Sequence, residues 1–178
     1  MYFSAAFLFS LVASTMALPT GSDSRNLAKR ALSVQTYSQF QISGGVGGNA
    51  LAEVKAKFPI DENNFAAVSA SDLAILKAAR QTAENAETKA GGFNEAIKAA
   101  GASTAAGKAL QVGKIKNKVL KLKLFEMVLK IEAAQGKSNA ADLADKQKKL
   151  TNNIALDKAA AGQTATSVDF QGSSQPKN

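Results

Sequence analysis

The sequence predicts an all-α protein: a small, alanine-rich helical bundle of four to five helices with a glycine-rich lead-in. Three observations support this fold class. Alanine, the residue with the highest helix propensity, supplies about a fifth of the 148 residues from 31 to 178. Apolar residues recur at helical spacing in several segments. Most of these segments begin at a Ser, Thr or Asn and end at a glycine. A chain of this length can bury a core without covalent cross-links.

The lead-in comes first. Residues 37–43 (YSQFQIS) alternate polar and apolar side chains and predict a short strand or an extended segment. Glycines between 44 and 48 allow a tight loop, and a short helix from Asn49 to Phe58 is stopped by Pro59. The loop fits a G-x-G-x-x-A pattern, yet no second strand follows, so we interpret it as a structural entry loop. Its amides at a helix start could receive an anion.

The longer helices follow in order. Ser69 with Asp72 resembles a capping box and marks the first of them. Gly107 and Gly113 are potential weak points within the third. We expect these helices over residues 69–90, 93–100, 103–134 and 138–161.

The stretch from Lys114 to Ala134 carries two apolar stripes on opposite sides. A helix with two apolar faces is best buried by neighbours on both, so we predict that it is the central helix of the bundle. Beyond Gly162, residues 163–178 are polar, and we predict a flexible tail. The two stripes are Ile115, Val119, Leu122 and Leu129, and Leu120, Leu124, Met127 and Ile131.

Residues 1–17 predict a cleavable signal peptide. Phe3 to Ala13 is almost wholly apolar but far shorter than the roughly 20 residues of a membrane-spanning helix. Thr15 and Ala17 place small side chains at positions −3 and −1 of the cleavage site, and Pro19 stops any helix from continuing. We therefore expect secretion. The alternative is a buried N-terminal helix.

Residues 18–30 predict a propeptide. This segment is polar and ends in Lys29-Arg30, which resembles the site of a kexin-type processing protease. Cleavage there leaves residues 31–178, with a helical domain over 31–162 and the tail over 163–178. The alternative is a charged linker that stays attached.

Composition argues against an enzyme. The chain has no cysteine and no histidine, which excludes disulfides, Cys–His pairs, Ser-His-Asp triads, and zinc or haem sites built on these residues. We expect no cofactor. The remaining acid–base candidates are carboxylate pairs, and nothing places them in a cleft. These pairs are Asp61-Glu62, Glu84-Glu87 and Asp142-Asp145. We interpret the last two, at i,i+3 spacing on polar helix faces, as solvated surface.

The charge is basic: 22 Lys and Arg against 14 Asp and Glu, a net of +8. It favours acidic partners, such as an anionic polysaccharide or a cell wall. Within residues 31–178 Arg80 is the only arginine, so we expect no specific nucleic-acid partner. One run forms a candidate basic interaction surface; the alternative is that its lysine stems cover the helix seams and its ammonium groups reach solvent. The run comprises Lys114, Lys116, Lys118, Lys121 and Lys123.

Residues 1–60 resemble small secreted proteins of filamentous fungi. The resemblance lies in Tyr37–Ser43, the glycine-rich loop, Asn49–Glu53 and Phe58-Pro59, together with the signal-peptide and dibasic layout. It implies a cell-surface component or a candidate effector that acts on a host, and no catalytic residues come with it. We expect a secreted non-enzymatic protein that binds a protein partner. The alternative is a basic structural protein of the cell wall.

Overall fold

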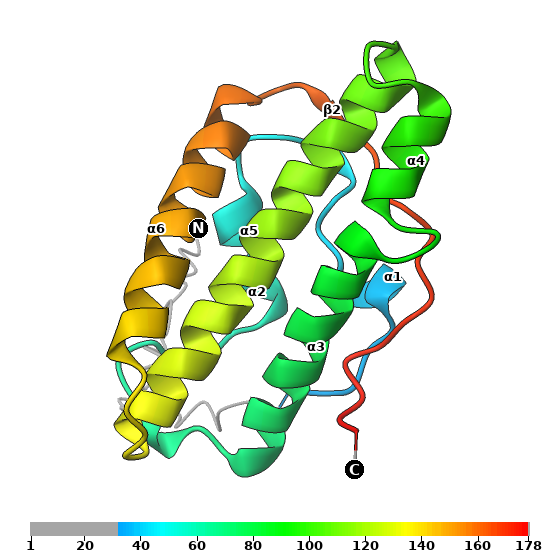
Figure 1. Ribbon diagram of the computed structural model, residues 1–178. Helices are drawn as coiled ribbons and strands as arrows, with labels where there is room; N and C mark the ends of the chain where they lie inside the picture. The colour runs from blue at the N-terminus through cyan, green and yellow to red at the C-terminus, as the bar shows by residue number, and fades with distance from the viewer. Residues whose placement is uncertain (1–31, 178) are drawn as a thin grey trace, which may run out of the picture.

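The computed structural model describes residues 32–177, and it is an all-α bundle as the sequence predicts. The central helix is α5 (Ala105–Ala134), which runs between α3 (Ala70–Thr88) and α6 (Ala140–Ala159) (Figure 1). Both predicted stripes of α5 are covered by neighbouring elements: Val119 of the first stripe and Leu120 of the second are fully buried. The prediction of a two-faced central helix is confirmed.

Capping residues set the helix starts. The Thr104 hydroxyl accepts the N–H of Gly107 and begins α5. The Ser69 hydroxyl accepts the N–H of Asp72 and begins α3. The Asp72 carboxylate does not return to Ser69, as a capping box would require, but accepts the N–H of Leu32 at 2.7 Å. Short elements complete the bundle: α2 (Ala50–Lys57), the 3₁₀ turn η1 (Phe65–Ala67) and α4 (Phe93–Ala100).

Residues 37–43 do not form the strand that their alternation suggests. Tyr37–Phe40 is a single helical turn, α1. The side chain of Gln39 accepts the N–H of Thr36 and fixes the start of this turn. Helical spacing turns both Tyr37 and Phe40 inward, where each is fully buried and their rings meet edge to face at 5.5 Å. In a strand these two rings would lie on opposite faces. A helical turn allows both aromatic rings to be buried, so it is the conformation that the fold favours.

The C-terminal segment is packed, contrary to the prediction of a flexible tail. β2 (Thr164–Ala165) pairs antiparallel with β1 (Gly45–Val46), and the N–H of Thr166 donates to the carbonyl of Ala109 in α5. Residues 170–177, which we call the C-terminal strap, lie along α3 (Figure 1). The strap is polar in sequence but hydrogen-bonded in the fold, and only the tertiary structure supplies its partners.

The two glycines within α5 mark close approaches rather than breaks in the helix. A Cβ at Gly107 would overlap the carbonyl of Gly101, and a Cβ at Gly113 would overlap the carbonyl of Thr166. Gly113 therefore lets the C-terminal segment lie directly on the central helix.

Candidate functional site

The five lysines predicted as a basic surface do not form one. Lys116 is 1% exposed, and its ammonium donates to the carbonyls of Gly44 (2.8 Å) and Val46 (2.9 Å). The same ammonium lies 3.0 Å from a carboxylate oxygen of Glu53. It therefore ties the glycine-rich loop and α2 to the central helix. Every donor position of a lysine ammonium has a partner here.

Lys123 is 4% exposed and lies in a second buried network. Its ammonium is 2.9 Å from Glu62 and 2.8 Å from Glu126, and Lys130 reaches Glu126 from the next turn at 2.7 Å. Burial alone would raise the pKa of Glu126. The hydrogen bonds from Lys123 and Lys130 outweigh it and lower that pKa to about 2. The pKa of Glu62 is lowered in the same way, against its burial, by Lys123 and Lys55.

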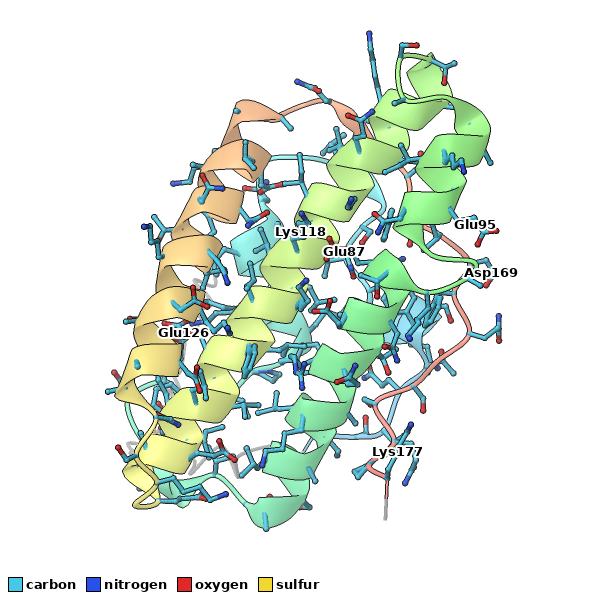
Figure 2. All side chains as sticks on the ribbon, in the orientation of Figure 1. Glu87, Glu95, Lys118, Glu126, Asp169 and Lys177 are labelled. Atoms are coloured by element: carbon cyan, nitrogen blue, oxygen red, sulfur yellow. The ribbon has the colours of Figure 1, made fainter. Side chains whose placement is uncertain are left out.

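The other three lysines of the stretch also have partners. Lys121 bridges Glu84 (3.0 Å) and Glu87 (2.7 Å) of α3. Lys118 lies 3.4 Å from Glu87, and Figure 2 shows these two side chains on adjacent helices. Lys114 donates to the side-chain oxygen of Asn94 in α4. All five lysines of this run therefore have partners within the bundle. The alternative interpretation, in which the ammonium groups reach solvent, does not hold for the buried Lys116 and Lys123.

The predicted anion position at the start of α2 is occupied from within the chain. Asp157 of α6 is 2% exposed, and its two carboxylate oxygens accept the N–H groups of Gly48 (3.0 Å) and Ala50 (2.9 Å). This carboxylate meets the positive end of the α2 dipole. The loop therefore binds α6 rather than a ligand.

Among residues 32–177, seven of the thirteen carboxylates form ion pairs with lysine. Four others, Asp61, Asp72, Glu95 and Asp157, accept backbone N–H groups. Although burial opposes the shift, hydrogen bonds from lysine hold the pKa values of five of the ion-paired carboxylates below the usual value; these are Glu62, Glu87, Glu126, Glu132 and Asp145. A general acid needs the opposite environment, a desolvated carboxyl that keeps its proton at neutral pH.

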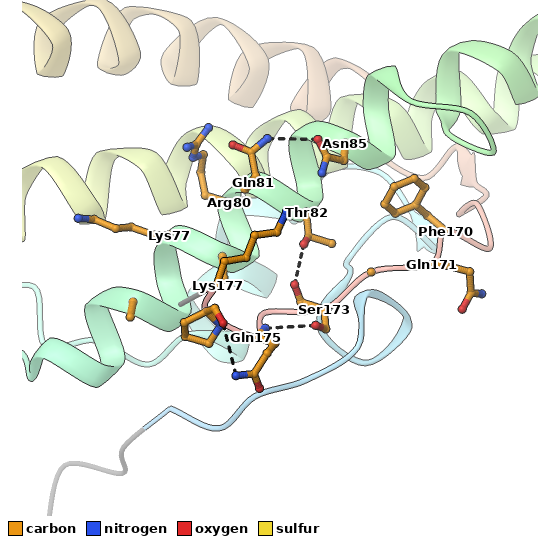
Figure 3. A pocket seen from close by; sticks show the side chains of 14 residues that line it. Lys77, Arg80, Gln81, Thr82, Asn85, Phe170, Gln171, Ser173, Gln175 and Lys177 are labelled. Carbon is orange, nitrogen blue, oxygen red and sulfur yellow. Dashed lines mark hydrogen bonds between the residues drawn. The ribbon is translucent and has the colours of Figure 1, made fainter.

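A concave feature lies between α3 and the strap; we call it the α3–strap groove. Its volume is about 530 Å³. Figure 3 shows the side chains that line it. Amide side chains line it from both walls: Gln81 and Asn85 from α3, Gln175 from the strap. Lys177 adds an ammonium, and the apolar lining comes from Ala74, Ala78, Phe170 and Pro176. None of the described residues that line it is a carboxylate.

Hydrogen bonds fix the strap as a wall of this groove. The Thr82 hydroxyl donates to the carbonyl of Ser173 at 2.6 Å. On the other edge of the strap, the N–H of Tyr37 donates to Gly172 and the N–H of Ser174 donates to Gln35. Gly172 has no room for a side chain, since a Cβ there would lie 2.7 Å from a methyl carbon of Thr82. Both walls of the groove are therefore fixed: one is the helix α3, and the other is the strap, which is hydrogen-bonded to the body of the protein.

Two cations at the groove have their charged ends turned toward the central helix. Lys77 pairs with Glu132 at 2.6 Å, and the guanidinium of Arg80 lies 4.7 Å from the ring centre of Phe125. Their stems line the groove, whereas Lys177 and the amides supply its polar groups.

Sequence reasoning missed the groove because it depends on the docked strap. One signal was present: Phe170 is the only aromatic residue between 163 and 178. Its ring packs against Tyr37, with centres 5.9 Å apart, and anchors the segment to the body.

The predicted processing residues Ala17, Lys29 and Arg30 lie outside the described residues. Within 32–177, none of the helices combines the length and the apolar character needed to cross a membrane.

Comparison with known proteins places the chain in a family. A family model described as "Domain of unknown function (DUF8454)" matches residues 32–169, and the chain belongs to that family. No curated protein and no solved structure matches the sequence. The matched region ends at Asp169, so the strap lies beyond it.

Proposed function

We propose that this member of the DUF8454 family is a secreted, non-enzymatic protein that acts by binding. In this proposal it is an effector or virulence-type factor that engages a protein of a host or of a neighbouring cell. The observation that carries it is the α3–strap groove, a concavity of about 530 Å³ with amides on both walls and Lys177 in its lining. Such a surface offers hydrogen bonds and charge, the means by which a site recognises a polar ligand.

The state of the carboxylates supports binding rather than turnover. Hydrogen bonds from lysine hold the pKa of Glu126 at about 2, and those of Glu62 and Glu87 lie below their usual value for the same reason. Side chains in this state are fixed anions at neutral pH and serve the fold.

The groove fits an acidic peptide in an extended conformation. From Ala74 to Asn85 the α3 wall is about 16 Å long at 1.5 Å per residue. An extended chain covers that length with about five residues. Lys177 and the absence of carboxylates from the described lining favour a ligand with Asp or Glu side chains. We therefore propose that the partner presents a short acidic segment.

A peptide library tests this proposal. Purified protein of residues 31–178 is titrated with seven-residue peptides that contain two Glu residues and with the same peptides carrying Gln instead. We expect measurable binding to part of the Glu set only. Lys177→Glu should weaken that binding about tenfold, the equivalent of about 1.4 kcal/mol, and Ala78→Trp should abolish it by filling the groove.

Lys148→Glu is the matched control. Lys148 is an exposed residue of α6, so this variant has the same net charge as Lys177→Glu but an unaltered groove. Equal losses in the two charge variants would mean unspecific attraction and would contradict the groove as the site. Equal binding of the Glu and Gln peptides would contradict the proposed ligand.

The second candidate is a basic structural protein of the cell wall. The excess of 19 Lys and Arg over 13 Asp and Glu in residues 31–178 favours it. Fractionation of the secreting cells separates the two candidates. Protein free in the medium supports the binding proposal, release from walls only by salt supports the alternative, and retention inside the cell contradicts both.

A further inference from the structure

A second concavity lies over α5, between α4 and α6; we call it the α4–α6 cavity. Its volume is about 360 Å³. Figure 1 shows α4 and α6 on opposite sides of α5. The floor of the cavity is one face of α5, because the α5 residues in the lining are three and four positions apart. These residues are Gln111, Lys114, Ile115 and Lys118.

The apolar part of the cavity comes from one side chain of each of the three helices. Ile97 of α4 and Ile115 of α5 are half-buried, and Leu156 of α6 is 45% exposed. Leu156 is one of three large apolar side chains that stay exposed among residues 32–177. Apolar surface that water covers in the free protein favours a ligand that removes it from water.

The polar part of the cavity carries positive charge. The ammonium of Lys114 donates to the side-chain oxygen of Asn94 at 2.6 Å, which is a neutral partner, and it forms no ion pair with a described carboxylate. Lys118 lies 3.4 Å from Glu87, whose other carboxylate oxygen pairs with Lys121 at 2.7 Å. Among the described residues, no carboxylate lines the cavity. An anion placed there meets two ammonium groups.

The surroundings of the cavity have the same sign. Lys98 of α4 and Lys158 of α6 are exposed, lie close in sequence to lining residues of these helices, and pair with no carboxylate of the described chain. The nearby carboxylates of Glu95 and Asp157 accept backbone N–H groups instead. The positive charge at this end of the bundle is therefore available to a ligand.

Two amide side chains add hydrogen-bond donors. Gln111 donates one N–H to the carbonyl of Ala102 at 2.7 Å, and Asn153 donates one to the carbonyl of Lys149 at 2.8 Å. A primary amide has two N–H groups, so each side chain keeps one for a ligand while the other holds it in place. A head group with several oxygens can accept from these amides and from the lysines.

We propose that the α4–α6 cavity binds a single-chain amphiphile with an anionic head group. The alkyl chain covers Ile97, Ile115 and Leu156, and the head group pairs with Lys114 and Lys118. The volume of about 360 Å³ lies near the lower end of the range for small-molecule sites, which favours one short alkyl chain over a two-chain lipid or a protein helix. The cavity shares no lining residue with the α3–strap groove, so this inference goes beyond the proposed function.

Calorimetry with three probes tests the ligand class. The protein of residues 31–178, which contains every described residue, is titrated with octanoate below its micelle concentration, with 1-octanol and with acetate. Octanol lacks the charge and acetate lacks the chain. We expect saturable binding of one octanoate per protein, and binding of the other two probes at least about tenfold weaker. No saturable binding of octanoate, or equal binding of either other probe, would overturn the proposal.

Two variants test the cavity as the site, each with a matched control. Lys114→Gln removes the charge and keeps a donor for Asn94, and it should weaken octanoate binding about tenfold. Leu156→Ser removes an exposed apolar side chain and should weaken binding about fivefold. Lys148→Gln and Val34→Ser make the same kinds of change at exposed positions outside the cavity and should bind as the parent does. Equal losses in variants and controls would overturn the assignment.

Methyl NMR of the unaltered protein locates the ligand without any substitution. Octanoate should shift the methyl resonances of Ile97, Ile115 and Leu156 and leave that of Ala78 in the α3–strap groove unchanged. Shifts at Ala78 alone would overturn the site. Binding to anionic vesicles without binding of octanoate would overturn the ligand in favour of a membrane surface. Lys177→Glu should bind octanoate as the parent does, so failed peptide binding leaves this inference standing.

Discussion

The central helix and the C-terminal strap contrast sharply. The lysines of α5 are the densest charge in the sequence, yet Lys116 and Lys123 are buried and paired. The strap is polar and without periodicity, yet it is hydrogen-bonded along both edges and forms a wall of the α3–strap groove. The lysines expected to form a surface are paired within the bundle, two of them buried, and the segment expected to be flexible is packed against the body.

The difference teaches where polarity is tolerated. A helix that is covered on both sides buries its lysines unless their stems reach solvent, and a buried charge requires a partner. A strap needs only backbone N–H and C=O groups, which every residue carries. Charge density therefore does not identify a binding surface in this protein, and low hydropathy does not identify a mobile segment.

The largest expected effect comes from breaking the buried pairing in α5. Lys123→Met leaves Glu126 and Glu62 without their shared cation, and we expect the free energy of unfolding to fall by about 4 kcal/mol. Urea denaturation at neutral pH measures it. Lys148→Met, at an exposed position of α6, is the control and should unfold at the parent midpoint. Similar losses of stability in both variants would contradict the claim that the buried ion pairs of Lys123 stabilise the fold.

Acidification should break the same network. The pKa of Glu126 is lowered to about 2 and those of Glu62 and Glu87 are also lowered, so the folded state binds protons less readily than the unfolded state. Their stabilisation is fully present above the unfolded pKa, near 4.5, and is lost as the pH falls through the folded value. For Glu126 the loss between pH 5 and pH 2 is about 3 kcal/mol.

Denaturation midpoints from pH 7 to pH 2 test this dependence. Glu126→Gln should be less stable at pH 7 and should show a flatter decline below pH 5. A decline as steep as that of the parent would place the acid-sensitive groups elsewhere.

A smaller effect is expected where the central helix meets the C-terminal segment. Gly113→Ala gains up to about 1 kcal/mol of helix propensity, but its methyl would overlap the carbonyl of Thr166. The overlap should win, with a net loss of about 2 kcal/mol in the free energy of unfolding. Gly44→Ala adds a methyl where the structure has open space and serves as the control. If Gly113→Ala were more stable than the parent protein, the chain around Thr166 would have to move away from α5 at little cost.

The smallest expected effect isolates one strap hydrogen bond. Thr82→Val keeps the shape of the side chain and removes the donor to Ser173, which should cost about 1 kcal/mol. Hydrogen exchange should accelerate at the N–H of Ser174, since the strap opens more often. Thr88→Val removes a local bond within α3 and should leave strap exchange unchanged. Unchanged exchange in Thr82→Val would mean that Phe170 and the backbone hold the strap without it.

The helices were predicted from the sequence, whereas the N-terminal turn and the groove were not. The 3.6-residue periodicity, the Thr104 and Ser69 caps and the glycine ends located α3, α4, α5 and α6 because these signals are local. The strand predicted for residues 37–43 was wrong, because an alternation of polar and apolar residues over so few positions fits a strand and a single helical turn equally well. Burial of both Tyr37 and Phe40 favours the helical turn. The groove was not predicted because its two walls are separated by about ninety residues in the sequence. Phe170 was the one local signal that the C-terminal segment contacts the body.

By itself the sequence determined the helical class, the two-faced central helix and the absence of any cysteine or histidine chemistry. All three follow from composition and short-range periodicity. Only the tertiary structure decided that Asp157 fills the anion position at α2, that the lysines of α5 find carboxylates on α2, α3 and beyond, and that the strap docks on α3. The physical reason is that the sequence shows which charges and backbone amides require a partner when they are buried. Which group becomes that partner depends on segments that are far apart in the sequence and meet only on folding.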